Sequence, residues 1–136
     1  MAIETNIILE FKGFPVIIPE TVVVPLHSKV RYIIRLYPEF KRLRFQWNLR
    51  RVELYFQDRP NGFEKRYNAN IPDRFDDVRN RDNAEVPTDI VLAEGNAESS
   101  GEFKYGVKAS NSQEEELFDE DPYLIILPQY RYGILH

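Results

Sequence analysis

The chain is 136 residues long, the size of one ordinary domain, and 43% of its residues are apolar, which is enough to build a hydrophobic core. It contains no cysteine, which excludes disulfides, thiolate metal ligands and cysteine nucleophiles. The net charge of −4 gives no overall sign of a nucleic-acid or membrane protein. The first residues have neither a basic cluster nor a long apolar run, so we expect a cytoplasmic protein without a signal peptide or a membrane-spanning helix.

Short stretches of alternating apolar and polar residues, separated by Pro, Gly and Asn, recur along the first half of the chain and predict β-strands. Prolines at positions 15, 19 and 25 break the second stretch into two short pieces, which is typical of edge strands. A turn is predicted at 58–62. The predicted strands of this half cover residues 5–11, 16–18, 21–24, 29–36, 42–47, 52–56 and 63–67.

The second half of the chain is more polar but continues the strand pattern. A short helical turn is predicted within 73–80, and loops are predicted over 94–101 and 113–121. The predicted strands cover residues 88–92, 103–107 and 123–127. Many short strands with at most one short helix predict an all-β fold, a two-sheet Greek-key β-sandwich that forms a single domain over 1–136.

One face of each predicted strand supplies the expected core, in which Trp47, the only tryptophan, fills space between the sheets. The expected core residues are Val30, Tyr32, Ile34, Phe45, Trp47, Val52, Leu54, Phe56, Phe103, Tyr105, Val107, Ile125 and Leu127.

The stretch GEFKYGV, residues 101–107, resembles the strand Gly-x-aromatic-x-aromatic-x-Cys of cupredoxins, and YLIIL, 123–127, resembles their closing strand. Upstream, VVV followed by HSKV, within 22–30, resembles the family's strand, tight turn and next strand, and 52–56 resembles the strand that carries the first copper histidine. The resemblance implies a cupredoxin-like sandwich, or the immunoglobulin-like sandwich of small bacterial proteins.

The copper ligands of that family are absent here. Val107 stands at the cysteine position and Ser110 at the histidine position, and no histidine lies between Ser28 and Leu135. A blue-copper site needs two histidines and a thiolate, so this chain cannot build one. We therefore expect no metal and no cofactor.

A basic stretch runs from residue 29 to 51 and contains one acid, Glu39. Its basic residues are Lys29, Arg31, Arg35, Lys41, Arg42, Arg44, Arg50 and Arg51. Strand periodicity puts Arg31 and Arg35 on one face of one strand, and pairing with strand 42–47 would extend it into a basic face. This face is either solvated or neutralised by the protein's own acids, or it binds an acidic protein or an anion. A nucleic acid is a further alternative, through Arg42, Arg44, Arg50 and Arg51.

An acidic loop precedes the last predicted strand. Its carboxylates belong to Glu114, Glu115, Glu116, Asp119, Glu120 and Asp121. A solvated hairpin loop whose charges discourage edge pairing explains them. A calcium site and a basic partner are the alternatives, although the spacing of an EF-hand loop is missing.

The tail, residues 128–136, offers Tyr130, Tyr132, Ile134 and Leu135 in alternation. It forms either a final strand on its own sandwich or a strand donated to the edge of a neighbour, for which the proline-broken strands near the N-terminus would be a matching edge.

Catalytic patterns are missing from the sequence. His27 and His136 are the only histidines, there is no glycine-rich phosphate loop, and nothing places two carboxylates in a cleft. We therefore expect a non-catalytic interaction or assembly domain that binds a protein partner or copies of itself. An anion or nucleic-acid binder and an unrecognised carboxylate-based enzyme or calcium site are the alternatives.

Overall fold

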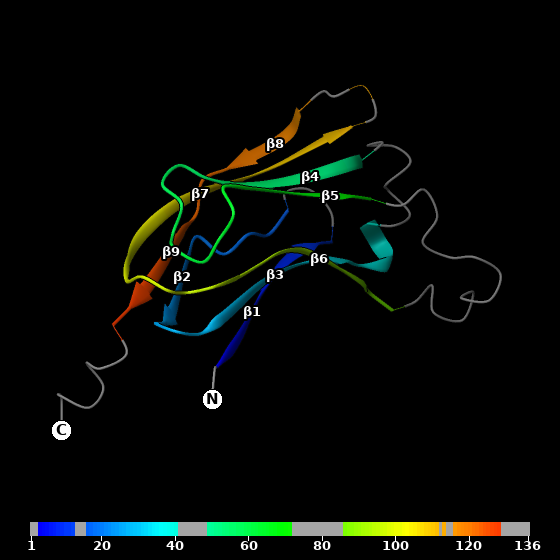
Figure 1. Ribbon diagram of the computed structural model, residues 1–136. Helices are drawn as coiled ribbons and strands as arrows, with labels where there is room; N and C mark the ends of the chain where they lie inside the picture. The colour runs from blue at the N-terminus through cyan, green and yellow to red at the C-terminus, as the bar shows by residue number, and fades with distance from the viewer. Residues whose placement is uncertain are drawn as a thin grey trace.

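The computed structural model describes residues 3–12, 16–40, 49–71, 86–111, 113 and 116–128. These residues form an all-β sandwich of two sheets (Figure 1). A single helical turn covers 38–40, and none of the described helical residues forms a segment long and apolar enough to cross a membrane. The strands are β1 (Glu4–Phe11), β2 (Thr21–Pro25), β3 (Lys29–Leu36), β4 (Leu49–Phe56), β5 (Arg66–Asn70), β6 (Thr88–Asn96), β7 (Gly101–Asn111), β8 (Glu116–Glu120) and β9 (Tyr123–Leu127).

The smaller sheet has the order β1-β3-β6, and the larger sheet has the order β2-β9-β7-β4-β5 with β8 also paired to β7. β1 runs parallel to β3 and β2 runs parallel to β9, whereas the other pairs are antiparallel. β7 is the long strand that organises the larger sheet. One of its sides pairs with β9 over 101–104 and with β8 over 107–110, and its other side pairs with β4. This order leaves β2 and β5 at the two ends of the larger sheet (Figure 1).

The core lies between the two sheets, where strand alternation turns every second side chain inward. Eight of the expected core residues are buried: Val30, Tyr32, Ile34, Val52, Leu54, Phe56, Tyr105 and Val107. Tyr32 of the smaller sheet meets Tyr105 of the larger one with ring centroids 5.2 Å apart. Phe103 packs against this core while partly exposed. Phe45 and Trp47 lie outside the described residues.

The prediction that Ile125 and Leu127 belong to the core is wrong. Their neighbours Leu124 and Ile126 are the buried residues of β9, with exposed fractions of 0% and 1%. Every residue of β9 except Tyr123 is aliphatic, so alternation could not choose its inner face. The parallel register with β2, which sets Ile126 beside the buried Val24, makes that choice.

The strands predicted over 5–11, 29–36, 52–56 and 123–127 are confirmed, and those over 88–92 and 103–107 are confirmed as parts of longer strands. The prediction that 113–121 is a loop without a strand is wrong, because β8 lies within it and pairs with β7. The loop predicted over 94–101 begins later, since β6 continues to Asn96. The strand predicted over 63–67 lies at β5 instead. Residues 16–18 contribute one isolated bridge, between Glu10 and Ile17. The predicted strand 42–47 and helical turn 73–80 lie outside the described residues.

Candidate interaction surfaces

Acids on the outer face of the smaller sheet pair with three of the eight basic residues of the stretch 29–51, namely Lys29, Arg31 and Arg35. Arg35 forms a bidentate ion pair with Asp89 of β6, with N···O distances of 2.8 and 2.9 Å. Glu94, also on β6, accepts from Arg31 Nε at 2.9 Å and lies 3.1 Å from Lys29 Nζ. The bonds to these cations lower the pKa of Asp89 and of Glu94 below their ordinary values. Arg31 and Arg35 are therefore engaged within the fold, which matches the alternative of a face neutralised by the protein's own acids.

The two neighbours of β3 are β1 and β6. The strand predicted over 42–47, whose pairing with 29–36 was the condition for a basic face, lies outside the described residues. Arg42 and Arg44 lie outside the described residues. Arg50 and Arg51 lie near the start of β4, which belongs to the other sheet. The basic stretch is consequently divided between two faces of the sandwich.

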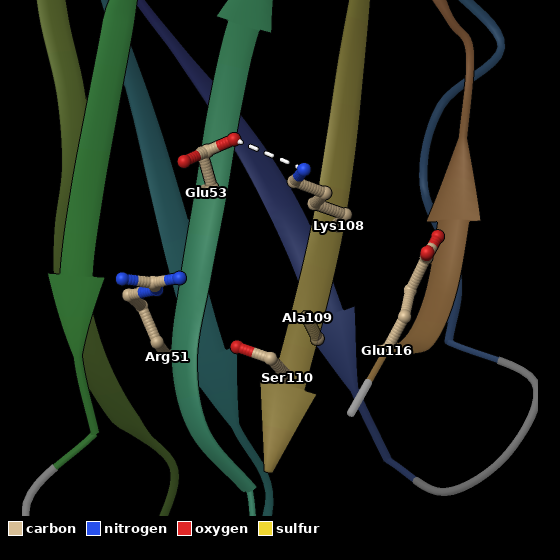
Figure 2. A pocket seen from close by; sticks show the side chains of 6 residues that line it. All are labelled: Arg51, Glu53, Lys108, Ala109, Ser110 and Glu116. Atoms are coloured by element: carbon tan, nitrogen blue, oxygen red, sulfur yellow. Dashed lines mark ion pairs between the residues drawn. The ribbon is translucent and has the colours of Figure 1, made fainter. Parts of the chain in front are cut away.

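A small polar pocket of about 120 Å³ lies on the outer face of the larger sheet (Figure 2). Three strands build it, because the register sets Arg51 of β4 opposite Ser110 of β7, and Ser110 opposite Glu116 of β8. The pocket thus joins one residue of the basic stretch to one residue of the acidic stretch. The residues that line it are Arg51, Glu53, Lys108, Ala109, Ser110 and Glu116.

One end of the pocket is electrically neutralised by a buried carboxylate. Glu53 is 9% exposed, and its Oε1 lies 3.1 Å from Arg66 Nη1 and 3.5 Å from Lys108 Nζ, the second contact being the dashed line in Figure 2. The ring of Tyr55 lies beneath both cations, 5.8 Å from the Arg66 guanidinium and 5.6 Å from Lys108 Nζ. Such a buried anion with two cations is held in place and is unavailable to a ligand.

The other end of the pocket offers free charges. Within the described parts of the chain, neither Arg51 nor Glu116 makes an ion pair. Of the other acidic candidates, Glu120 is exposed at the far end of β8, and Asp119 stands opposite Lys108 in the register. Arg51 is the one cation of the pocket that is not paired with Glu53, so it is the group there that can receive an anion.

β2 forms an open edge of the larger sheet. The residues that flank β2 form backbone hydrogen bonds with β9: Tyr123 N donates to Glu20 O and Leu26 N donates to Leu127 O, each at 2.8 Å. The backbone groups of the even-numbered residues therefore face β9. Backbone groups alternate along a strand, so the N–H and C=O of Thr21 and Val23 point away from β9. No described strand pairs with β2 on that side. The sequence-based prediction of an edge strand over 21–24 is confirmed.

The side chains beside this edge are unusually apolar for a surface. Val23 is 53% exposed and stands opposite Ile125 in the register, and Tyr123, which is 37% exposed, stands opposite Thr21. Leu127 lies on the same outer face and is half-buried. A strand with one face in water normally alternates apolar and polar residues, whereas β9 is apolar on both faces. An apolar strip therefore runs along β9 up to the open edge.

Charge distinguishes β2 from the other strands that end or border the sheets. Edge strands are normally protected against pairing by charged side chains, prolines, bulges or shortness. The sequence of β2 is TVVVP, with a proline at its end and no charged residue. Each of the other such strands carries charge: Glu4 and Glu10 in β1, Arg66 in β5, Asp89 and Glu94 in β6, and Glu116 and Glu120 in β8.

Several candidate residues cannot be placed, because Glu114, Glu115, Tyr130 and Tyr132 lie outside the described residues. The structure adds Glu53, Asp89 and Glu94, which no sequence pattern singles out, since only the strand register shows which cation each one meets. Over the described ranges, no group of three or more His, Cys, Asp or Glu residues could hold a metal ion.

No family model matches the chain, and no curated protein matches it. Among solved structures, the cysteine protease inhibitor EhICP2 from Entamoeba histolytica is similar over 91% of this chain and 97% of that chain, with 12% sequence identity and a TM-score of 0.47. Similarity at this level carries no conclusion about function.

Proposed function

We propose that the protein is a non-catalytic interaction domain that binds a protein partner, or a copy of itself, along β2 and the apolar strip beside it. The observation that carries this proposal is the open, uncharged edge of β2, with Val23 53% exposed. An extended segment added to such an edge satisfies the free N–H and C=O groups of Thr21 and Val23. Apolar side chains of the added segment would at the same time cover Val23, Tyr123 and Ile125.

The proposal is tested with a photo-crosslinking residue, p-benzoylphenylalanine, placed at position 23 of the full chain. The matched control carries it at position 91, because Val91 is 55% exposed on β6 of the other sheet. Irradiation of the purified protein, and of cells that express it, is expected to give protein adducts from position 23 and not from position 91. Equal adducts from both positions, or none from either, would contradict a binding edge at β2.

A second candidate function is the capture of an acidic partner or anion at the polar pocket. Arg51 favours it, since this guanidinium has no ion pair among the described residues and lies beside the hydroxyl of Ser110. An acidic peptide should then bind in low salt, Arg51→Gln should abolish the binding, and Glu116→Gln should strengthen it. An oligonucleotide in the same titration distinguishes the nucleic-acid alternative, because its affinity falls steeply with salt concentration.

The sandwich is proposed to be cupredoxin-like in its arrangement. Two features support this. β2 is followed by a three-residue turn and then by β3, as in the strand, tight turn and strand of that family, and the aromatic strand β7 pairs antiparallel with the closing strand β9. Val107, at the place of the copper cysteine, is fully buried and Ser110 lines the pocket, so these positions serve the core and the surface here.

A further inference from the structure

We infer that the segment bound by β2 is the tail of a second copy of this chain. The inference rests on the proposed function of the β2 edge and names its occupant. Two copies would exchange residues 129–136 reciprocally, each adding a strand to the β2 edge of the other. The same surface is used twice, which gives a closed two-fold dimer and not an open chain.

The tail leaves the fold close to the edge that it would fill on its partner. Leu127, the last residue of β9, stands opposite Pro25, the last residue of β2. The eight residues after Pro128 can extend over about 26–29 Å, which is longer than a five-residue strand of about 17 Å. One tail is therefore long enough to cross the gap to a neighbour and still pair along the whole of β2.

The alternation of apolar residues in the tail has the same two-residue spacing as the free backbone groups of β2. Tyr130, Tyr132 and Ile134 recur at every second residue, so an extended tail has one apolar face. The free backbone groups of β2 also recur at every second residue, at Thr21 and Val23. In a ladder with β2, the apolar face of the tail would cover Val23 while its backbone bonds to these groups.

Turn chemistry favours a second copy over the same molecule. To reach its own β2 edge, the tail would have to cross the end of β2 and reverse direction directly after β9. The residues available for that reversal are Pro128, Gln129, Tyr130, Arg131 and Tyr132. Apart from Pro128, which can occupy the first central position of a turn, they include none of the Gly, Asn, Asp or Ser residues that the other positions of tight reversals favour. Leu127 precedes a proline and so prefers an extended backbone. A chain that continues outward meets a neighbour without any reversal.

The experiment measures solution mass by light scattering over a range of protein concentrations. The full chain is expected to form a dimer, and a chain that ends at Leu127 is expected to stay monomeric. Val23→Lys places a charge on the edge and should raise the dimer dissociation constant by about tenfold or more, as expected for the loss of one or two backbone hydrogen bonds. Val91→Lys, at a site of equal exposure on the other sheet, should leave the constant unchanged.

A mixing experiment isolates the exchanged contact. The shortened chain keeps an open β2 edge but lacks a tail, and the full-length Val23→Lys chain keeps its tail but has a blocked edge. At a concentration below the dissociation constant of the Val23→Lys dimer, each alone should be monomeric, and the two together should form a one-to-one complex. A synthetic peptide of residues 128–136 should bind the shortened chain and compete with that complex.

Several outcomes would overturn the inference. A full chain that is monomeric at every concentration, a shortened chain that still dimerises, or a peptide that does not bind the shortened chain would each do so. The crosslinker at position 23 separates this failure from a failure of the proposed function. Adducts to another protein with no dimer would leave the β2 edge as a binding site and remove the tail as its occupant.

Discussion

Replacing Tyr32 and Tyr105 by Phe, singly and together, is expected to raise the free energy of unfolding. Both side chains are fully buried at the centre of the sandwich, and neither hydroxyl has a hydrogen-bond partner among the described residues. A buried hydroxyl without a partner costs about 1–3 kcal/mol, whereas Phe keeps the ring and its packing. Each single change should therefore stabilise the fold by about 1 kcal/mol, and the double change by about twice that.

Urea denaturation followed by circular dichroism measures these differences, and thermal unfolding provides a second measure. A gain of about 1 kcal/mol raises the midpoint of a chain of this size by roughly 3–5 °C. Tyr105→Ala serves as the contrast, since removal of the ring leaves a cavity and should cost about 3–5 kcal/mol.

The same two hydroxyls predict how stability responds to alkaline pH. Burial raises the pKa of Tyr105 to about 12 and raises that of Tyr32 well above its ordinary value. In the unfolded chain both tyrosines lose their protons near pH 10, so between pH 10 and 12 the folded state holds more protons than the unfolded state. Ionisation of these tyrosines therefore leaves the free energy of unfolding unchanged below pH 10 and lowers it as the pH rises from 10 to 12. The double Phe variant should lose less stability over this range.

The reasoning is refuted if either single Phe variant is less stable than the original chain. That result would mean that the hydroxyls are satisfied, by each other or by a buried water molecule. The double-mutant cycle then distinguishes these two cases. If the hydroxyls bond to each other, the double variant loses less stability than the sum of the two single variants.

Three further changes test a close packing contact in β6, the turn after β2 and an ion pair on the outer surface. Gly95→Ala should destabilise the fold by roughly 1–3 kcal/mol in urea denaturation, because a Cβ there would overlap the ring of the buried Phe63; no loss would show that the ring can move. His27→Gly should raise the unfolding free energy by up to about 1 kcal/mol, since this residue has φ 70°, and His27→Val should lower it. Asp89→Asn should reduce the loss of stability in acid, by about 0.5 kcal/mol given that the pair with Arg35 is partly exposed. The Arg35 guanidinium lowers the pKa of Asp89, so this contribution is present above pH 4 and disappears as the carboxylate is protonated at lower pH. If Asp89→Asn loses as much stability in acid as the original chain, the pair contributes nothing to the free energy of unfolding.

The sequence predicted the fold wherever alternation was unambiguous. In β3, the polar residues Lys29, Arg31 and Arg35 alternate with buried apolar ones, and both the bounds and the inner face were predicted correctly. In β9 the bounds were correct but the face was reversed, because a strand that is apolar on both sides carries no local signal for its orientation. Its orientation is decided by the pairing with β2 and β7, which lie far away in the sequence.

Charge patterns were less informative than apolar ones about the candidate site. The stretch 29–51 suggested a basic face on the condition that its strands pair, yet β3 and β4 belong to different sheets. The cations of β3 meet acids that follow them by dozens of residues, at Asp89 and Glu94. On the larger sheet, Glu53 of β4 meets Arg66 of β5 and Lys108 of β7. Only the register of the strands reveals these partners. The open edge at β2 was predictable for the opposite reason, since its prolines and its lack of charge are local features.

This division of the surface predicts how binding depends on salt. If the β2 edge is the binding site, the contacts are backbone hydrogen bonds and apolar side chains, and the dimer constant should change by less than about twofold between 50 mM and 500 mM salt. If Arg51 and the other cations drive association instead, the affinity should fall steeply over the same range. The ion pairs of Arg31 and Arg35 remove the strongest local source of such dependence, because their charge is already balanced within the smaller sheet. Light scattering of the full chain at the two salt concentrations therefore separates the two surfaces, and a strongly salt-sensitive dimer would move the binding site from β2 to the pocket.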